Sequence, residues 1–134
     1  MSRASDPLRK SVRLAGAGKT DKAVDLLEVT LKGLDASGTI DEIVLLSIHA
    51  SILCEGGLKD NRRARRILRR ALQHAPTDTR ALLSLSRLYL KAGKKRIARD
   101  LLDRRRETDE EKRNVGLQEL IQAISKTAGN DGLR

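Results

Sequence analysis

Residues 82–102, LLSLSRLYLKAGKKRIARDLL, contain two helical patterns of apolar residues on either side of Gly93. In the first pattern Leu82, Leu85 and Leu88 recur three positions apart and Tyr89 follows Leu85 by four, which places them on one face of a helix. In the second pattern Ala98 and Leu102 are four positions apart and also share a face. Glycine is the residue that most often follows the end of a helix. The stretch therefore predicts two short helices that pack against each other across a tight turn.

The second of these patterns occurs three times along the chain. Its copies are Ala23-x3-Leu27, Ala64-x3-Leu68 and Ala98-x3-Leu102. The last two copies are 34 residues apart and the first two are 41 apart. The seven additional residues are expected in loops, with five in the linker 38–42 and two in the turn 57–63. The spacing predicts three similar helix pairs, over about residues 7–35, 40–76 and 79–107.

Caps and turn residues give the expected bounds of the helices. Thr39 with Glu42, and Thr108 with Glu111, are capping boxes that open a helix. Seven helices are expected, over about residues 7–15, 21–34, 40–55, 61–74, 79–92, 95–106 and 109–128. We expect a single all-α domain over residues 1–128, followed by a disordered tail over 129–134.

The composition excludes several other classes of protein. Tyr89 is the only aromatic residue, which disfavours β sandwiches and barrels as well as the base-stacking modules that bind single strands. Cys54 is the only cysteine, so no intramolecular disulfide or cysteine-based metal cluster is expected. The longest apolar run, residues 43–46, is far too short to span a membrane. No secretory signal is recognised, and a cytoplasmic protein without membrane insertion is predicted.

The repeated pairs resemble the tetratricopeptide repeat, a helix–turn–helix unit with a 34-residue period. The clearest match is the third pair, through Leu82, Leu85, Ser86, Tyr89, Gly93, Ala98 and Leu102. The second pair keeps Ala50, Leu53, Gly57, Ala64, Leu68, Ala71 and Pro76. The first pair keeps Leu14, Gly18, Ala23 and Leu27. The resemblance implies an antiparallel helix-pair solenoid, wound as a right-handed superhelix, with the helix 109–128 as its C-terminal cap.

The resemblance also implies a function and a binding groove. Such arrays serve as non-enzymatic adaptors or scaffolds, and the first helix of each pair lines a concave groove. The groove residues implied for this chain are Arg80, Leu83, Arg87, Leu90 and Lys91 in the third pair, with Ser47 and Ser51 in the second. Arginine forms directional charge-assisted hydrogen bonds with carboxylates. The leading hypothesis is therefore capture of an acidic segment or C-terminal tail of another protein.

Positive charge gives a rival hypothesis. The chain has a net charge of +10, and residues 57–106 hold 17 Lys or Arg against four Asp. The densest cluster consists of Arg62, Arg63, Arg65, Arg66, Arg69 and Arg70. By the resemblance it lies on the outer, convex face, where it would bind the phosphate backbone of a nucleic acid. A solvated, compositionally biased surface is the third interpretation, and a homo-oligomer is compatible with all of them.

No constellation of residues indicates catalysis, a metal or another cofactor. The segment Gly16-Ala17-Gly18-Lys19-Thr20 resembles the end of a phosphate-binding loop, but Arg13 stands where that motif needs glycine. His49 and Cys54 are five residues apart, which does not place them on one helix face as ligands. The prediction is a protein that is not an enzyme.

Overall fold

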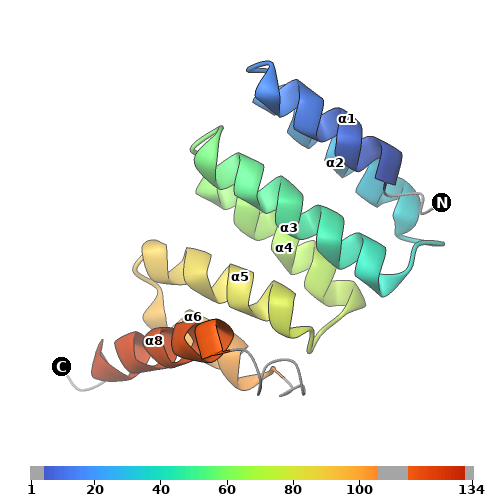
Figure 1. Ribbon diagram of the computed structural model, residues 1–134. Helices are drawn as coiled ribbons and strands as arrows, with labels where there is room; N and C mark the ends of the chain where they lie inside the picture. The colour runs from blue at the N-terminus through green and yellow to red at the C-terminus, as the bar shows by residue number, and fades with distance from the viewer. Residues whose placement is uncertain (1–4, 106–114, 132–134) are drawn as a thin grey trace. The chain divides into compact units, whose positions relative to one another are not determined.

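The computed structural model describes residues 5–105 and 115–131 (Figure 1). These residues form seven α helices and no β strand, as the sequence predicts. The helices are α1 (Ser5–Gly16), α2 (Thr20–Leu34), α3 (Ile40–Gly56), α4 (Asn61–His74), α5 (Thr79–Lys91), α6 (Lys95–Asp103) and α8 (Val115–Asp131). The bounds of the first six lie within about three residues of those predicted, which is close to the usual disagreement over helix ends.

Two predictions concern the C-terminal part of the chain. One needs correction, and the other falls outside the described residues. Helix α8 continues to Asp131, although a tail was expected from residue 129. Gly129 lowers helix propensity by about 1 kcal/mol relative to alanine, which weakens a helix without forbidding it. The capping box of Thr108 and Glu111 lies outside the described residues.

The chain divides into two compact units, residues 1–75 and 76–134. Unit 1 contains α1 to α4, and unit 2 contains α5, α6 and α8. The proposal of one domain over residues 1–128 stays a prediction.

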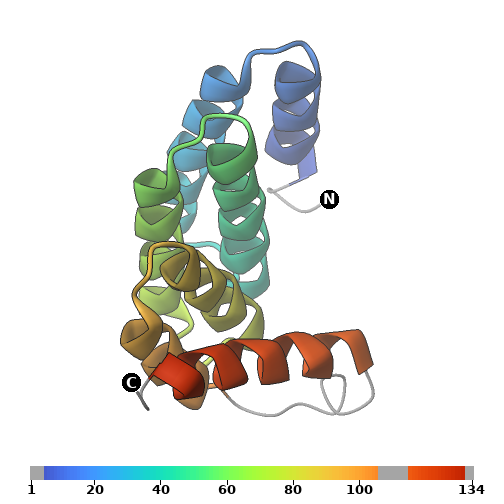
Figure 2. The same ribbon diagram turned by 90° about the vertical axis from the view of Figure 1, so that its left-hand side faces the viewer.

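Unit 1 consists of two antiparallel helix pairs, α1 with α2 and α3 with α4. Helices α1 and α3 lie on one side of the unit and α2 and α4 on the other (Figure 2). Ala23 and Ala64 are fully buried, and their small side chains let the paired helices approach closely. Leu27, Leu46 and Leu68 fill the space between the helices and are fully buried as well. The repeated Ala-x3-Leu element is therefore the core of each pair.

Each turn inside a pair contains one residue with a positive φ. Gly18 has a φ of 79°, Gly93 a φ of 76° and Lys59 a φ of 55°, and each stands one residue before a helix N-cap. Lys59 is therefore the counterpart of the two glycines, although the sequence pattern had assigned that place to Gly57. Gly57 is required for another reason, because a Cβ there would lie 2.5 Å from Thr20 Cγ2.

This assignment changes the register of α3. Helices α1 and α5 end two residues before Gly18 and Gly93, whereas α3 ends three residues before Lys59. The turn after α3 thus holds one more residue than the other two turns. If Gly57 were the counterpart of Gly93, each position on α3 would be matched to α5 one residue away from its true counterpart, and one residue corresponds to about 100° around a helix.

Unit 2 consists of the antiparallel pair α5–α6 with α8 packed on both helices. Buried side chains from all three helices form one apolar cluster, consisting of Leu83, Leu102, Ile121 and Ile124, with Leu90 packed against it. Since Ile121 and Ile124 are three residues apart, they lie on one face of α8. That face is the part of α8 that holds it to the pair.

Candidate functional site

The structure places the two predicted groove residues of α3 in the interior. Ser47 and Ser51 are buried, and the Ser51 hydroxyl donates a hydrogen bond of 2.7 Å to the Ile48 carbonyl oxygen. The prediction that they line an open groove is corrected by the longer turn after α3, which rotates these side chains into the core.

The exposed side of α3 is apolar. Leu45 is 50% exposed and Ile52 is 53% exposed, and Ile48 between them is half-buried. Helix α1 lies on the same side of unit 1 as α3 (Figure 2), and its Val12 is 54% exposed. We call the three α3 residues, Leu45, Ile48 and Ile52, the inner face. The sequence did not lead us to predict this inner face, although α3 has apolar residues on nearly every side. When neighbouring helices pack against the other sides of such a helix, one apolar side remains uncovered.

Three predicted groove residues on α5 are cationic. Arg80 is exposed, and its Nη2 lies 3.0 Å from Asp78 Oδ2. Asp78 also caps α5 by accepting a hydrogen bond of 3.2 Å from the Ala81 N–H. Burial alone would raise the pKa of Asp78, but the hydrogen bonds from Arg80 and Ala81 outweigh it and the pKa is lowered. Arg87 is half-buried and Lys91 is exposed.

The apolar groove residues of α5 lie under α8. Leu83 is buried against Leu102, Ile121 and Ile124, and Leu90 packs on the same cluster. The apolar part of the predicted groove is therefore occupied in unit 2 by the chain's own C-terminal helix.

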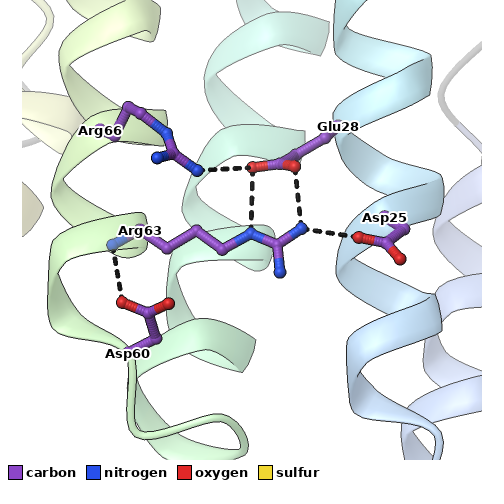
Figure 3. A network of polar contacts seen from close by, with 5 residues as sticks. All are labelled: Asp25, Glu28, Asp60, Arg63 and Arg66. Carbon is purple, nitrogen blue, oxygen red and sulfur yellow. Dashed lines mark hydrogen bonds and ion pairs between the residues drawn. The ribbon is translucent and has the colours of Figure 1, made fainter.

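The arginine cluster of α4 is partly neutralised by acids of α2. Arg63 Nη2 lies 2.7 Å from Asp25 Oδ1 and 2.9 Å from Glu28 Oε2, and Arg63 Nε donates to Glu28 Oε1 at 3.3 Å (Figure 3). These hydrogen bonds, those to Glu28 above all, raise the pKa of Arg63, so the guanidinium stays charged. Asp60 caps α4 by accepting a hydrogen bond of 3.0 Å from the Arg63 N–H.

A second ion-pair cluster lies further along the same two helices. Asp35, which follows α2, pairs with Arg70 and lies 3.1 Å from His74 Nε2. The hydrogen bond from Arg70 is the main reason that the pKa of Asp35 is lowered. The sequence showed no acid within α4, and the pairing acids come from residues more than 30 positions earlier. Arg62, Arg66 and Arg69 remain exposed on this side.

A cavity of about 410 Å³ lies between α2 and α4, with α3 as its floor. We call it the outer cavity. Its apolar lining includes Leu31, Ile43 and Ile67, and Lys32 and Arg66 also line it. No local sequence pattern indicates this cavity, because it depends on the distance between two helices.

The described residues give no support for metal or nucleophilic chemistry. They contain no group of three His, Cys, Asp or Glu side chains that could hold a metal ion. Cys54 is buried, and burial raises the pKa of its thiol to about 11, so it is protonated at neutral pH. Burial also lowers the pKa of His49. Within the same part of the chain, no helix is long and apolar enough to cross a membrane.

The fold and these surfaces define a helical-repeat protein with no recognisable catalytic centre in its described part. A family model described as tetratricopeptide repeat matches residues 57–131, which is more than half of the chain. The chain belongs to the tetratricopeptide repeat family. Such repeats generally mediate protein–protein interactions and are typically non-catalytic scaffolds. No curated protein and no solved structure matches the chain.

Proposed function

We propose that this protein is a non-catalytic adaptor that binds an acidic segment of another protein through Arg80, Arg87 and Lys91 of α5. The observation that carries the proposal is the concentration of charge, with 17 basic and four acidic residues between positions 57 and 106. A field of one sign attracts partners of the opposite sign and speeds their encounter.

The spacing of the three cations supports this proposal. Arg80, Arg87 and Lys91 are separated by seven and four residues, which places them along one face of α5. A face with cations at helical spacing suits an extended or helical segment with acidic side chains.

The contacts of the outer arginines make nucleic-acid binding the weaker candidate. Arg63 and Arg70 are bound to Asp25, Glu28 and Asp35, so binding phosphates would first require these ion pairs to break. The acids beside them would also repel a phosphate backbone. The outer face is thus less positive than the sequence of α4 alone indicates.

The test compares Arg87→Glu with Arg69→Glu, which change the net charge by the same amount. Arg69 is exposed on α4 and serves as the matched control. The probes are fluorescent peptides rich in Glu and Leu, their Lys-for-Glu counterparts, and a random-sequence DNA duplex. We expect Arg87→Glu to weaken binding of the acidic peptides about tenfold or more, and Arg69→Glu to change it about twofold.

The result that would overturn the proposal is preferential binding of the duplex. In that case Arg69→Glu would be as damaging as Arg87→Glu, and affinity would fall steeply between about 50 and 200 mM salt. Equal loss for both variants with the acidic peptides would likewise reject a specific role for α5.

A further inference from the structure

The outer cavity lies on the opposite side of unit 1 from the inner face and contains no residue of α5. Its volume of about 410 Å³ falls within the range of about 300–1,000 Å³ that is usual for small-molecule sites. Such sites are mostly apolar and hold a few polar groups that orient the ligand. The outer cavity has both features.

The walls of the cavity offer apolar surface. Leu31, Ile43 and Ile67 are buried residues that line it, and Val29 on α2 is 69% exposed at its wall. A large exposed aliphatic side chain beside a buried apolar floor gains from being covered, because its surface is then removed from water. The body of a ligand that fits here is aliphatic.

Ion pairs neutralise the acids at both ends of the cavity. Arg63 binds Asp25 and Glu28 at one end, and Asp35 is bound at the other by Arg70. Because residue numbers rise in the same direction on both helices, α2 and α4 run parallel. The middle of the cavity is therefore the stretch between these two clusters.

The middle of the cavity is lined by two cations, Lys32 from α2 and Arg66 from α4. The closest carboxylate oxygen to Arg66 is Glu28 Oε1 at 4.0 Å, and Glu28 already accepts two hydrogen bonds from Arg63. The Arg66 side chain is 68% exposed, compared with 19% for Arg63. Lys32 is exposed and has no ion pair within the described residues. This arrangement favours an anionic group at the mouth of the cavity.

We propose that the outer cavity binds a small amphipathic carboxylate, with its aliphatic chain on the floor and its carboxylate between Lys32 and Arg66. A free aliphatic acid and the C-terminal carboxylate of an apolar peptide share this chemistry. The site is independent of the proposed binding of acidic segments, since every residue that lines it lies in α2, α3 or α4 or, in the case of Asp35, directly after α2.

The first experiment titrates the full chain with decanoate and follows backbone amide signals by NMR. We expect the largest shifts at residues of α2, α3 and α4 that line the cavity. Decylammonium, which has the same chain and the opposite charge, and butyrate, which has the same head group and a short chain, should bind much more weakly. A parallel titration with N-acetyl-leucyl-leucine distinguishes a peptide carboxylate from a free aliphatic acid by its relative affinity.

The second experiment uses charge-reversal variants. Arg66→Glu and Lys32→Glu should each weaken decanoate binding about tenfold, while Arg69→Glu, which lies outside the cavity, should change it less than about twofold. Arg66→Glu should also gain affinity for decylammonium, a result that loss of folding cannot produce.

Three results would overturn the proposal. One is no binding of either carboxylate, and another is NMR shifts centred outside the cavity. The third is equal loss of decanoate binding in the Arg66→Glu and Arg69→Glu variants. None of these results bears on the acidic-peptide measurements, which depend on Arg87.

Discussion

In unit 1 the helices α2 and α4 are joined by ion pairs across a cavity, whereas in unit 2 the C-terminal helix α8 is held by apolar side chains. Arg63 reaches Asp25 of α2, and Arg70 reaches Asp35 directly after α2, through long, flexible side chains. Leu83, Leu102, Ile121 and Ile124 instead pack into one cluster. Neighbouring helices are thus held together by ion pairs in unit 1 and by apolar packing in unit 2.

The difference has consequences for stability and for binding. Exposed ion pairs contribute about 0–1 kcal/mol each, whereas burial of a large aliphatic side chain contributes about 1.5–3 kcal/mol. Apolar side chains that pack together leave no cavity between the helices. Long ion-paired side chains can instead connect two helices without filling the space between them. We therefore expect unit 2 to lose more when a side chain is truncated, and unit 1 to respond more to salt and acid.

The largest effect is expected for Leu102→Ala in unit 2. Leu102 is almost fully buried in the cluster, so truncation should reduce the free energy of unfolding by about 2–5 kcal/mol. Urea unfolding followed by circular dichroism measures the loss. Leu120→Ala on the exposed part of α8 is the control and should stay within about 0.5 kcal/mol of the parent protein. Equal losses for both variants would show that α8 is not held by this cluster.

A smaller effect is expected for Arg63→Met in unit 1. Methionine keeps an unbranched stem but removes the guanidinium, and Glu28 then loses both hydrogen bonds from Arg63. The expected cost is about 1–2 kcal/mol, between the values for exposed and buried pairs. A double-mutant cycle with Glu28→Gln should give a clear coupling energy that decreases at high salt. Strict additivity of the two changes would contradict the contact.

The equivalent turns of the two units allow a matched comparison. Gly93→Ala places a side chain at a φ of 76° in open space, so only the backbone conformation opposes it, at a cost of about 1 kcal/mol. Lys59→Gly makes the reverse change at a φ of 55° and should gain a few tenths of a kcal/mol, since glycine also loses more entropy on folding. Thermal unfolding of both variants checks the signs. A clear loss from Lys59→Gly would contradict the new register.

The smallest effect is the pH dependence of the Asp35 cluster. The pKa of Asp35 is lowered in the folded protein, so its contribution to stability is complete above its unfolded value of about 3.9 and is lost as pH falls through the folded value. Amide exchange at residues of α4 should accelerate in that range, and Asp35→Asn should remove this part of the acid dependence. The apolar contacts of α8 should show no matching change. An unaltered acid response in Asp35→Asn would exclude this carboxylate as the cause.

Local sequence patterns predicted the bounds of the helices well, but they did not predict which residues form the inner face. Thr39 and Asp60 cap their helices, since the side chain of each accepts a hydrogen bond from a backbone N–H in the first turn. The groove assignment of Ser47 and Ser51 was wrong because the turn was aligned on Gly57, and one extra residue before Lys59 rotates α3. The pairing of Arg63 with Glu28 was missed because the two residues are 35 positions apart.

The sequence by itself determined the all-helical fold, the helix pairs and the family, because apolar periodicity, caps and turns act between residues close along the chain. The tertiary structure alone decided which side of α3 stays open, which arginines of α4 are neutralised, and that α8 covers Leu83. Each of these depends on the rotation of one helix against another. One additional residue in a turn changes that rotation by about 100°. The spacing of residues in the sequence does not indicate which of the resulting helix orientations packs best.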